Sequence, residues 1–354
     1  MALTRRKFFA FGAVAMLLSL LVTMAGALAA DLYLHHRAER SAGLNRWGYR
    51  GPVAGRKQPG EVRLVLLGGS TAFGYGGTWD EAIPALLEQQ LKQVESSRNW
   101  RGINLGYNSE GAYAFLPTLR DFEWLDYDVV ILYEGYNDLQ GDQIPNRAVY
   151  RHESPVFRLT GYFPMLPLAL GEKALALRHG GNLDAAYAAA RGESPKTVFR
   201  PGLADRTSAA ALEAAAKVSD SLSRQIGRLA SSEARPAVAT TSEAGCTFPW
   251  VNYCQSVYAA TRYALERGKA VAIVAQPKKI GDGADRHREQ QRALADMINR
   301  HFANNPRIRY VDLTDTVDLQ DSELAFDGMH LGADGNAIIA KALVAPVRLL
   351  AGAL

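Results

Sequence analysis

Short apolar runs alternate with helical spacings from residue 61 onward. Short runs typical of strands occur at 62–67, 103–105, 128–133, 270–275 and 308–313, and the first of them is apolar except for Arg63. Stretches with the spacing of amphipathic helices lie at 82–94, 112–122, 286–302 and 333–350. Strand and helix therefore follow one another in turn. This pattern predicts a three-layer α/β/α fold with a parallel sheet, whose ligands bind at the carboxyl ends of the strands.

The alternation is interrupted between about 140 and 250. Four prolines come early in this stretch, and alanine-rich segments follow around 185–190 and 209–216. We predict one domain over 61–354 with an insertion of loops and helices at about 140–250. The insertion is interpreted either as a lid over the sheet edge or as a structural helical annex. Residues 31–60 are expected to form a linker.

The N-terminal segment has the features of an export signal. Arg5, Arg6 and Lys7 precede an uncharged segment over 8–30, which is long enough to span a bilayer. Residues 4–9 resemble a twin-arginine signal, and the small-x-small step at 27–29 is typical of a cleavage site. Residues 1–30 are therefore predicted to be an export signal or an N-terminal transmembrane anchor. We expect a periplasmic domain anchored in the inner membrane by 8–30, with cleavage to a soluble periplasmic or secreted form as the alternative.

Charge and composition exclude several classes of protein. The formal charge of 40 − 36 = +4 includes three positive residues of the leader, so the remainder carries 37 − 36 = +1. A nearly neutral body does not suit a nucleic-acid binder that depends on charge, and no nucleic-acid partner is expected. Two cysteines are too few for a disulfide-built scaffold, and no pair of C-x-x-C motifs exists to hold structural zinc.

Two short polar motifs follow predicted strands directly. The Gly-Gly-Ser-Thr motif at 68–71 permits a sharp turn that projects the Ser70 hydroxyl, as a nucleophile requires. A phosphate-binding loop is the alternative, but no Gly-Lys-Ser/Thr sequence follows. The Gly-Tyr-Asn-Asp motif at 135–138 is ordinarily a turn, and its functional value would be the Asn137 amide as a hydrogen-bond donor.

A third motif, Asp-Gly-Met-His at 327–330, precedes the last predicted helix. Among the seven histidines, only His330 has an acid three residues earlier, Asp327. This spacing allows the carboxylate to bond Nδ1 and leaves Nε2 for a nucleophile. A metal site is disfavoured because no second histidine stands at metal-ligand spacing. An ordinary surface loop is the remaining alternative for this motif alone.

Together, in this chain order, the motifs resemble those of the SGNH (GDSL-like) hydrolase superfamily, with its flavodoxin-like sheet. The resemblance covers roughly 61–140 and 268–350, and Gly69 stands where the family often has Asp. It implies that Ser70 is the nucleophile, that Asp327 and His330 complete a triad, and that Asn137 lies in the oxyanion hole. The stretch 104–111 is two residues longer than the family's Asn-x-Gly-x-x-Gly block. The oxyanion N–H of that block is assigned to Gly111, with Ser109 as the alternative.

The resemblance implies a serine ester hydrolase without cofactor or metal, acting on an extracytoplasmic carbohydrate or lipid ester. The Ser70 N–H would join Gly111 and Asn137 in the oxyanion hole, and the substrate would be a small-molecule or polysaccharide ester. One alternative is an O-acyltransferase or deacetylase of an envelope or secreted polysaccharide. Another is a non-catalytic binding protein on the same scaffold, against which the presence of all four polar residues argues. Nothing in the sequence separates hydrolase from transferase.

The two cysteines lie eight residues apart, with Pro249 and Trp250 between them. An exported domain meets an oxidising compartment, so we predict a Cys246–Cys254 disulfide that holds the hinge of the insertion and takes no part in chemistry. Two separately buried free thiols are the alternative.

Overall fold

The computed structural model describes residues 5–108, 110–133, 135–139, 155–178, 243–278 and 281–354. Its contacts divide the chain into two units. The N-terminal unit contains Met1–Ser41 and Ser154–Ser231, and the sheet unit contains Ala42–Glu153 and Ser232–Leu354. Each unit is described by itself.

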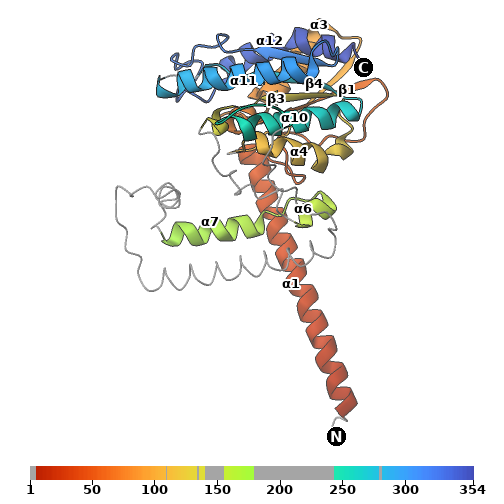
Figure 1. The fold of residues 1–354 in the computed structure, drawn as a ribbon. Coiled ribbons are helices and arrows are strands. Elements are labelled where there is room, and N and C mark those ends of the chain that lie inside the picture. The colour runs from red at the N-terminus through yellow and green to blue at the C-terminus, as the bar shows by residue number, and fades with distance from the viewer. Residues whose placement is uncertain (1–4, 109, 134, 140–154, 179–242, 279–280) are drawn as a thin grey trace. The chain divides into compact units, whose positions relative to one another are not determined.

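The sheet unit is built on five parallel strands in the order β2-β1-β3-β4-β5 (Figure 1). The strands are β1 Glu61–Leu67, β2 Asn99–Asn104, β3 Val129–Tyr133, β4 Ala270–Ala275 and β5 Ile308–Asp312. Strands β3 and β4 are buried along their whole length, as their apolar runs predict. The predicted parallel α/β fold is confirmed. Because the chain runs from β1 outward to β2 and then back to β3, a topological switch point lies between β1 and β3, where such sheets bind their ligands.

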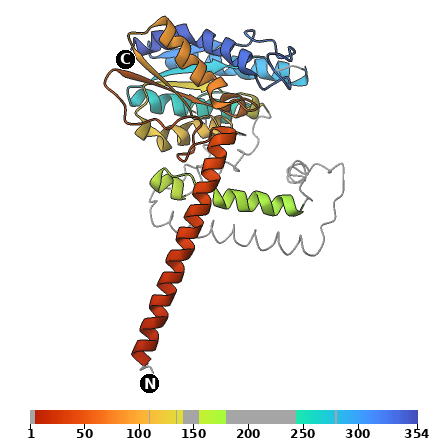
Figure 2. The same ribbon diagram turned by 180° about the vertical axis from the view of Figure 1, so that it is seen from behind.

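Helices cover both faces of this sheet (Figure 2). Helices α3 Ile83–Val94 and α12 Ala333–Ala351 pack together on one face. Helix α10 Val251–Glu266 contacts both α4 Phe115–Asp121 and α11 Ala284–Phe302 on the other face, the arrangement that right-handed crossovers produce. The remaining elements of this unit are short: α2 Ser70–Phe73, η1 Trp79–Glu81, η2 Ala112–Ala114, η3 Glu123–Leu125, η4 Tyr136–Asp138 and η5 Gly281–Gly283.

The N-terminal unit is dominated by α1 Arg5–Ala42, a helix of 38 residues. Its apolar part is exposed, and by length and composition the helix can cross a membrane. Two further helices, α6 Pro155–Thr160 and α7 Leu166–Arg178, belong to the same unit. The Asp31 carboxylate accepts hydrogen bonds from the Met165 and Leu166 N–H groups, so the first charged residue after the apolar part of α1 caps the start of α7.

The region expected as a linker, 31–60, is different in the structure. Residues up to Ala42 continue α1, and both Asp31 and His35 are buried. Beyond α1, the Arg50 N–H donates to the Asn104 carbonyl at 3.0 Å, and Tyr49 is buried against the sheet unit. Residues 43–51 of this stretch are largely buried, whereas most of 55–60 are exposed.

The predicted insertion at 140–250 lies largely outside the described residues. Within it, the structure describes α6, α7 and the segment from 243 onward, which leads into α10. The interpretation as a lid or as an annex stays a prediction.

Candidate active site

Ser70 begins α2 immediately after β1, at the switch point of the sheet. The turn needs a glycine at position 68, where φ is +158° and a Cβ atom would lie 2.0 Å from the Tyr133 carbonyl oxygen. Without that side chain, the end of β1 approaches the end of β3 closely. The first N–H groups of a helix have no intrahelical acceptors, and Ser70 is the first residue of α2.

His330 and Asp327 lie in the loop before α12, where the structure brings them to Ser70. His330 Nε2 lies 2.7 Å from Ser70 Oγ, across 260 positions of sequence. On the other side of the ring, His330 Nδ1 lies 2.6 Å from Asp327 Oδ2. The His330 N–H also donates to Asp327 Oδ1 at 2.7 Å. Three residues predicted from two separate motifs therefore form one line of hydrogen bonds.

The electrostatics of this line favour an ionised Asp327. Burial raises the pKa of Asp327, but hydrogen bonds from the side chain and backbone of His330, attraction to the imidazole and a bond from the Met329 N–H together hold it below its usual range. An ionised carboxylate accepts a hydrogen bond from the Nδ1–H of the imidazole. Nε2 is then the acceptor for the Ser70 hydroxyl, the arrangement that activates a serine.

Asn137 and Gly111 lie on two turns that are bonded to each other at the same edge of the sheet. The Asn137 amide, in η4 directly after β3, donates one hydrogen to the Glu110 carbonyl at 2.7 Å. The neighbouring Asp138 Oδ2 accepts the Ala112 N–H at 2.9 Å. A Cβ atom at Gly111 would lie 2.8 Å from Asp138 Oδ1, so this close approach requires a glycine. The alternative donor, Ser109, lies outside the described residues.

Gln276 is a polar residue that sequence reasoning missed. Its side chain is fully buried, donates to Thr71 Oγ1 at 2.7 Å and accepts the Tyr136 N–H at 3.2 Å. Gln276 thus joins the turn that carries Ser70 to the turn that carries Asn137. A signal was present, because Gln276 directly follows the apolar strand β4, as Ser70 and Asn137 closely follow β1 and β3.

Two half-exposed aromatic rings pack against the imidazole. The ring centroid of Tyr75 lies 5.0 Å from that of His330, and Phe326 stacks on His330 at 5.9 Å. Tyr75 and Phe326 are each 50% exposed to solvent. The rings therefore combine contact with His330 and access to solvent at the edge of the site.

Asp138 gives the site a pH dependence that can be measured. Burial raises the pKa of Asp138 to about 7, against the opposing hydrogen bond from the Ala112 N–H. An unfolded aspartate titrates near pH 4, so between about pH 4 and 7 the folded chain holds more protons than the unfolded chain. The free energy of unfolding is expected to fall as pH rises through this window.

Asp138→Asn keeps the acceptor for Ala112 and removes the titration. We expect the melting temperature of this variant to depend less on pH between about 4.5 and 7.5 than that of the wild type. Thermal unfolding in a pH series measures this, with the exposed Asp285→Asn as the control. Equal slopes for wild type and Asp138→Asn would contradict the raised pKa.

Metal ions in proteins are bound mainly by groups of His, Cys, Asp and Glu side chains. Among the residues that the structure describes, no group of three or more such side chains is arranged to hold a metal ion.

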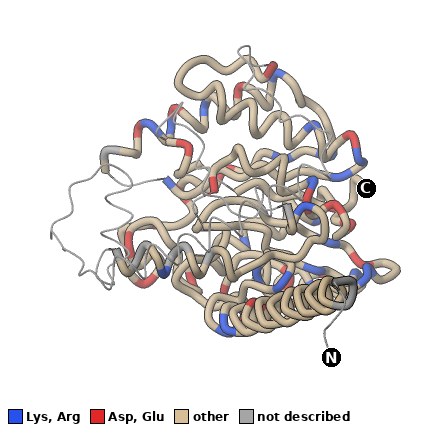
Figure 3. The backbone as a smooth tube through the Cα atoms, turned by 90° about the horizontal axis from the view of Figure 1, so that it is seen from below, with Lys and Arg blue, Asp and Glu red and all other residues tan. Residues whose placement is uncertain are grey.

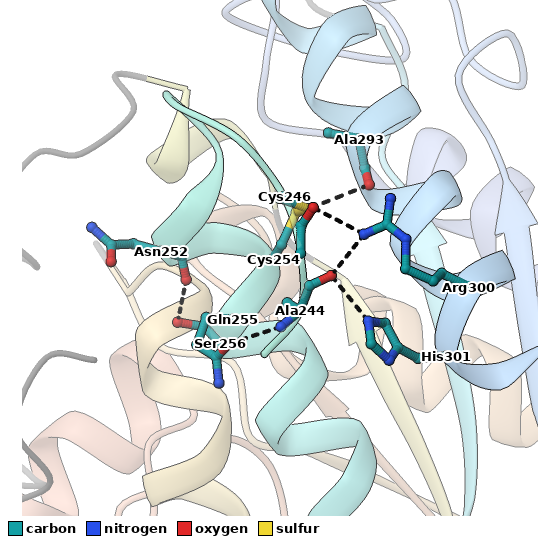
Figure 4. The surroundings of a disulfide bond; sticks show 10 residues. Ala244, Cys246, Asn252, Cys254, Gln255, Ser256, Ala293, Arg300 and His301 are labelled. Atoms are coloured by element: carbon teal, nitrogen blue, oxygen red, sulfur yellow. Dashed lines mark hydrogen bonds between the residues drawn. A yellow bond between two sulfur atoms is a disulfide. The ribbon is translucent and has the colours of Figure 1, made fainter. Parts of the chain in front are cut away.

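A disulfide joins Cys246 to Cys254, whose Cα atoms are 6.2 Å apart (Figure 4). Cys254 belongs to α10, and Cys246 belongs to the segment that leads into it. The Ala244 carbonyl beside the bridge lies within hydrogen-bond distance of Arg300 Nη1 and His301 Nε2 on α11. The bridge thus fixes the return of the inserted segment to the sheet unit.

Replacing both cysteines by serine is expected to lower stability without affecting turnover. By the loop-entropy estimate, closing so short a loop contributes roughly 2 to 3 kcal/mol to the free energy of unfolding. Thermal unfolding of the double variant, beside wild type with and without reductant, measures the loss. Two titratable thiols in unreduced, denatured wild-type protein would refute the bridge. Loss of hydrolysis in the folded double variant would refute a purely structural role for the bridge.

Comparison with known proteins places the chain in a family. No curated protein matches it. Among solved structures, similarity extends to a protein of the G-D-S-L family from Desulfitobacterium hafniense DCB-2, with 12% identity over 82% of this chain and 99% of that one and a TM-score of 0.42. A family 3 carbohydrate esterase from Clostridium thermocellum shares 11% identity over 82% and 98%, with a TM-score of 0.40. A variant of the acetyl xylan esterase Axe2 from Geobacillus stearothermophilus shares 13% over 82% and 94%, with a TM-score of 0.41.

The family model of the GDSL-like Lipase/Acylhydrolase family matches residues 66–256. The match includes Ser70 and Asn137, whereas Asp327 and His330 come after it. It covers more than half of the chain and confirms the superfamily expected from the motifs. The chain therefore belongs to the GDSL-like lipase/acylhydrolase family and is a hydrolase of ester bonds.

Proposed function

We propose that the chain hydrolyses esters through a triad of Ser70, His330 and Asp327. The observation that carries this proposal is the line of hydrogen bonds from Ser70 Oγ through both imidazole nitrogens to Asp327. His330 Nε2 takes the hydroxyl proton as Ser70 Oγ attacks the ester carbonyl. The tetrahedral intermediate then expels the alcohol, which receives that proton from His330. Water, activated by His330 in the same way, attacks the acyl-enzyme and releases the acid and Ser70.

The oxyanion of the intermediate is proposed to bind three donors. They are the Ser70 N–H at the start of α2, the Gly111 N–H and the Asn137 amide. The bond from Asn137 to the Glu110 carbonyl and the bond from Ala112 to Asp138 support this assignment, because they hold both turns at the switch point of the sheet. Donors held in place before the reaction stabilise developing charge without reorganisation.

The proposed substrate is an extracytoplasmic ester of a carbohydrate or a lipid. In the proposed mechanism His330 protonates the leaving alcohol, so rings beside His330 lie on the alcohol side of the site. Tyr75 and Phe326 offer half-exposed aromatic faces there, which suits the ring of a sugar. The same feature favours the second candidate function, an O-acyltransferase or deacetylase of an envelope or secreted polysaccharide, because a sugar hydroxyl on that side can replace water.

The purified full-length chain in mild detergent tests both functions. Release of p-nitrophenol from p-nitrophenyl acetate and longer-chain esters is measured with and without a polysaccharide acceptor, and acetate release from an acetylated polysaccharide is measured in parallel. A hydrolase yields free acid in each case, whereas a transferase yields an acylated polysaccharide. Polysaccharide binding without Ser70-dependent turnover would instead support a binding protein and overturn the proposal.

We further propose that α1 anchors the enzyme in the inner membrane with its sheet unit on the periplasmic side. The exposed apolar part of α1 and the basic residues that precede it support this orientation. The Cys246–Cys254 bridge is compatible with an oxidising compartment.

After fractionation of expressing cells, the protein is expected in the membrane pellet even after a carbonate wash, with an N-terminus at or near residue 1. The apolar length of α1 is the physical reason, since it exceeds what a bilayer requires. A truncated chain that begins at Asp31 serves as the soluble control. Wild-type protein recovered in the periplasmic fraction with an N-terminus near Ala30 would show that the segment is cleaved.

A further inference from the structure

Arg50 lies in the stretch before β1, outside the residues matched by the family, and its side chain is buried. All three guanidinium nitrogens donate to backbone carbonyls. Nε donates to Ala42 at 2.9 Å, Nη1 to Phe73 and to Gly74 at 2.7 Å, and Nη2 to Gly77. Three of these four carbonyls belong to one turn, residues 73–77.

This turn is hydrogen-bonded to the backbone of the candidate nucleophile. The N–H groups of Gly74 and Tyr75 both donate to the Ser70 carbonyl at 3.0 Å. Gly74 has the left-handed φ of +81°, and a Cβ atom there would lie 2.8 Å from Arg50 Nη1. The glycine thus permits both the turn and the close approach of the guanidinium. The position of Ser70 is therefore linked through one hydrogen-bonded turn to Arg50.

The same turn also reaches the candidate base. Tyr75 packs against the His330 imidazole. A Cβ atom at Gly76 would lie 2.6 Å from the ring of Phe326, which also stacks on His330. A shift of residues 73–77 would therefore move groups that touch His330. Both partners of the 2.7 Å contact between Ser70 and His330 depend on this turn.

The charged guanidinium of Arg50 forms hydrogen bonds with these carbonyls rather than an ion pair. Among the residues that the structure describes, no acid lies within ion-pair distance of Arg50. Burial lowers the pKa of Arg50 to about 10, while Asp80 and Glu81 act in the opposite direction, so the guanidinium remains charged at neutral pH. A planar fork of donors matches four carbonyls in fixed directions, which the single ammonium of a lysine cannot do.

We propose that Arg50 is a positioning residue of the esterase site, holding the turn at 73–77 so that Ser70 and His330 keep their hydrogen-bonded geometry. This inference rests on the proposed function. Arg50 acts through the turn and does not touch the reacting atoms.

Arg63 provides a matched control. It is also buried, donates to the Leu125 and Gly55 carbonyls at 2.7 Å, and pairs with Glu61 at 2.8 Å. It lies near the amino end of β1, at the edge of the sheet opposite Ser70. Arg63→Ala therefore removes a buried guanidinium from the same unit without disturbing the turn.

The experiment compares Arg50→Ala, Arg50→Lys and Arg63→Ala in the full chain, at a temperature where all are folded. We expect Arg50→Ala to lower kcat for p-nitrophenyl acetate by about 10- to 100-fold with little change in KM, because a misplacement of about 1 Å has this effect on catalysis. Arg50→Lys should remain impaired. Guanidinium chloride at non-denaturing concentration should restore part of the kcat of Arg50→Ala. Arg63→Ala should lose melting temperature and keep kcat within about twofold of the wild type.

A readout that does not depend on turnover separates this inference from the proposed function. The imidazole N–H resonance of His330, in protein labelled with ¹⁵N-histidine, reports its bond to Asp327. It should shift in Arg50→Ala, return with guanidinium and stay in place in Arg63→Ala. An unchanged resonance in Arg50→Ala, or equal losses of kcat in Arg50→Ala and Arg63→Ala, would overturn the role of Arg50. A wild type without Ser70-dependent turnover, but with the shifted resonance in Arg50→Ala, would overturn only the esterase proposal.

Discussion

Ser70→Ala and His330→Ala are each expected to lower kcat for ester hydrolysis by about 10³-fold or more, and the double variant should be little worse than either single variant. The reason is the 2.7 Å contact between Ser70 Oγ and His330 Nε2, which makes the two groups one functional unit. Neither partner activates a nucleophile alone. Steady-state hydrolysis of p-nitrophenyl acetate measures the loss, and thermal unfolding verifies that each variant is folded.

Ser256→Ala is a suitable control. Its hydroxyl donates to the Asn252 carbonyl within α10, where it stabilises only local structure. Its kcat should match that of the wild type. Near-normal hydrolysis by Ser70→Ala would place the nucleophile elsewhere, and multiplicative losses in the double variant would show that Ser70 and His330 act independently.

Asn137→Ala has the second largest expected effect, a loss of about 10²-fold in kcat with KM nearly constant. The amide is proposed to bind the oxyanion, which exists only after attack on the carbonyl, so its removal weakens the transition state more than the bound substrate. Asn137→Asp should fall at least as far, because a carboxylate offers no N–H and adds repulsion.

Asn305→Ala is the matched control, since the partly buried Asn305 side chain accepts the Arg307 N–H in the turn before β5. An unchanged kcat in Asn137→Ala would move the oxyanion hole to other donors. A parallel fall in kcat and melting temperature would instead assign Asn137 to holding the Glu110 turn.

Much of the fold could be predicted because the strands of a parallel sheet are buried on both faces and therefore consist of short apolar runs. Residues 128–133 and 270–275 read as buried strands, and the structure places β3 and β4 there, paired in register from Val129 with Ala270. The polar residues that follow such strands must meet at one edge of the sheet. For that reason Ser70 and Asn137 could be singled out before the structure was known, while His330 was reached through its spacing from Asp327.

Residues that act through the backbone of distant segments could not be found in this way. Arg50 bonds carbonyls that lie 23 to 27 positions later, and a carbonyl acceptor leaves no trace in the identity of a side chain. Asp138 was visible only as part of a turn motif, because its contact with Ala112 requires the fold of both turns. The stretch 31–60 was expected to be a linker, but Arg50 within it is hydrogen-bonded into the sheet unit through backbone carbonyls.

The inserted segment divides the sequence of the sheet unit into two parts, one before it and one after it. Ser70, Asn137 and the first three strands precede it, whereas β4, β5 and the Asp327–His330 pair follow it. The two parts are joined by the ladder between β3 and β4, not by a short loop. The insertion leaves after Asn137 and returns at the disulfide before α10, so both of its ends lie at the carboxyl edge of the sheet. A change in the length of the inserted segment therefore leaves the pairing of β3 with β4 intact, because the hydrogen-bonded ladder, and not the chain between the two strands, sets their register.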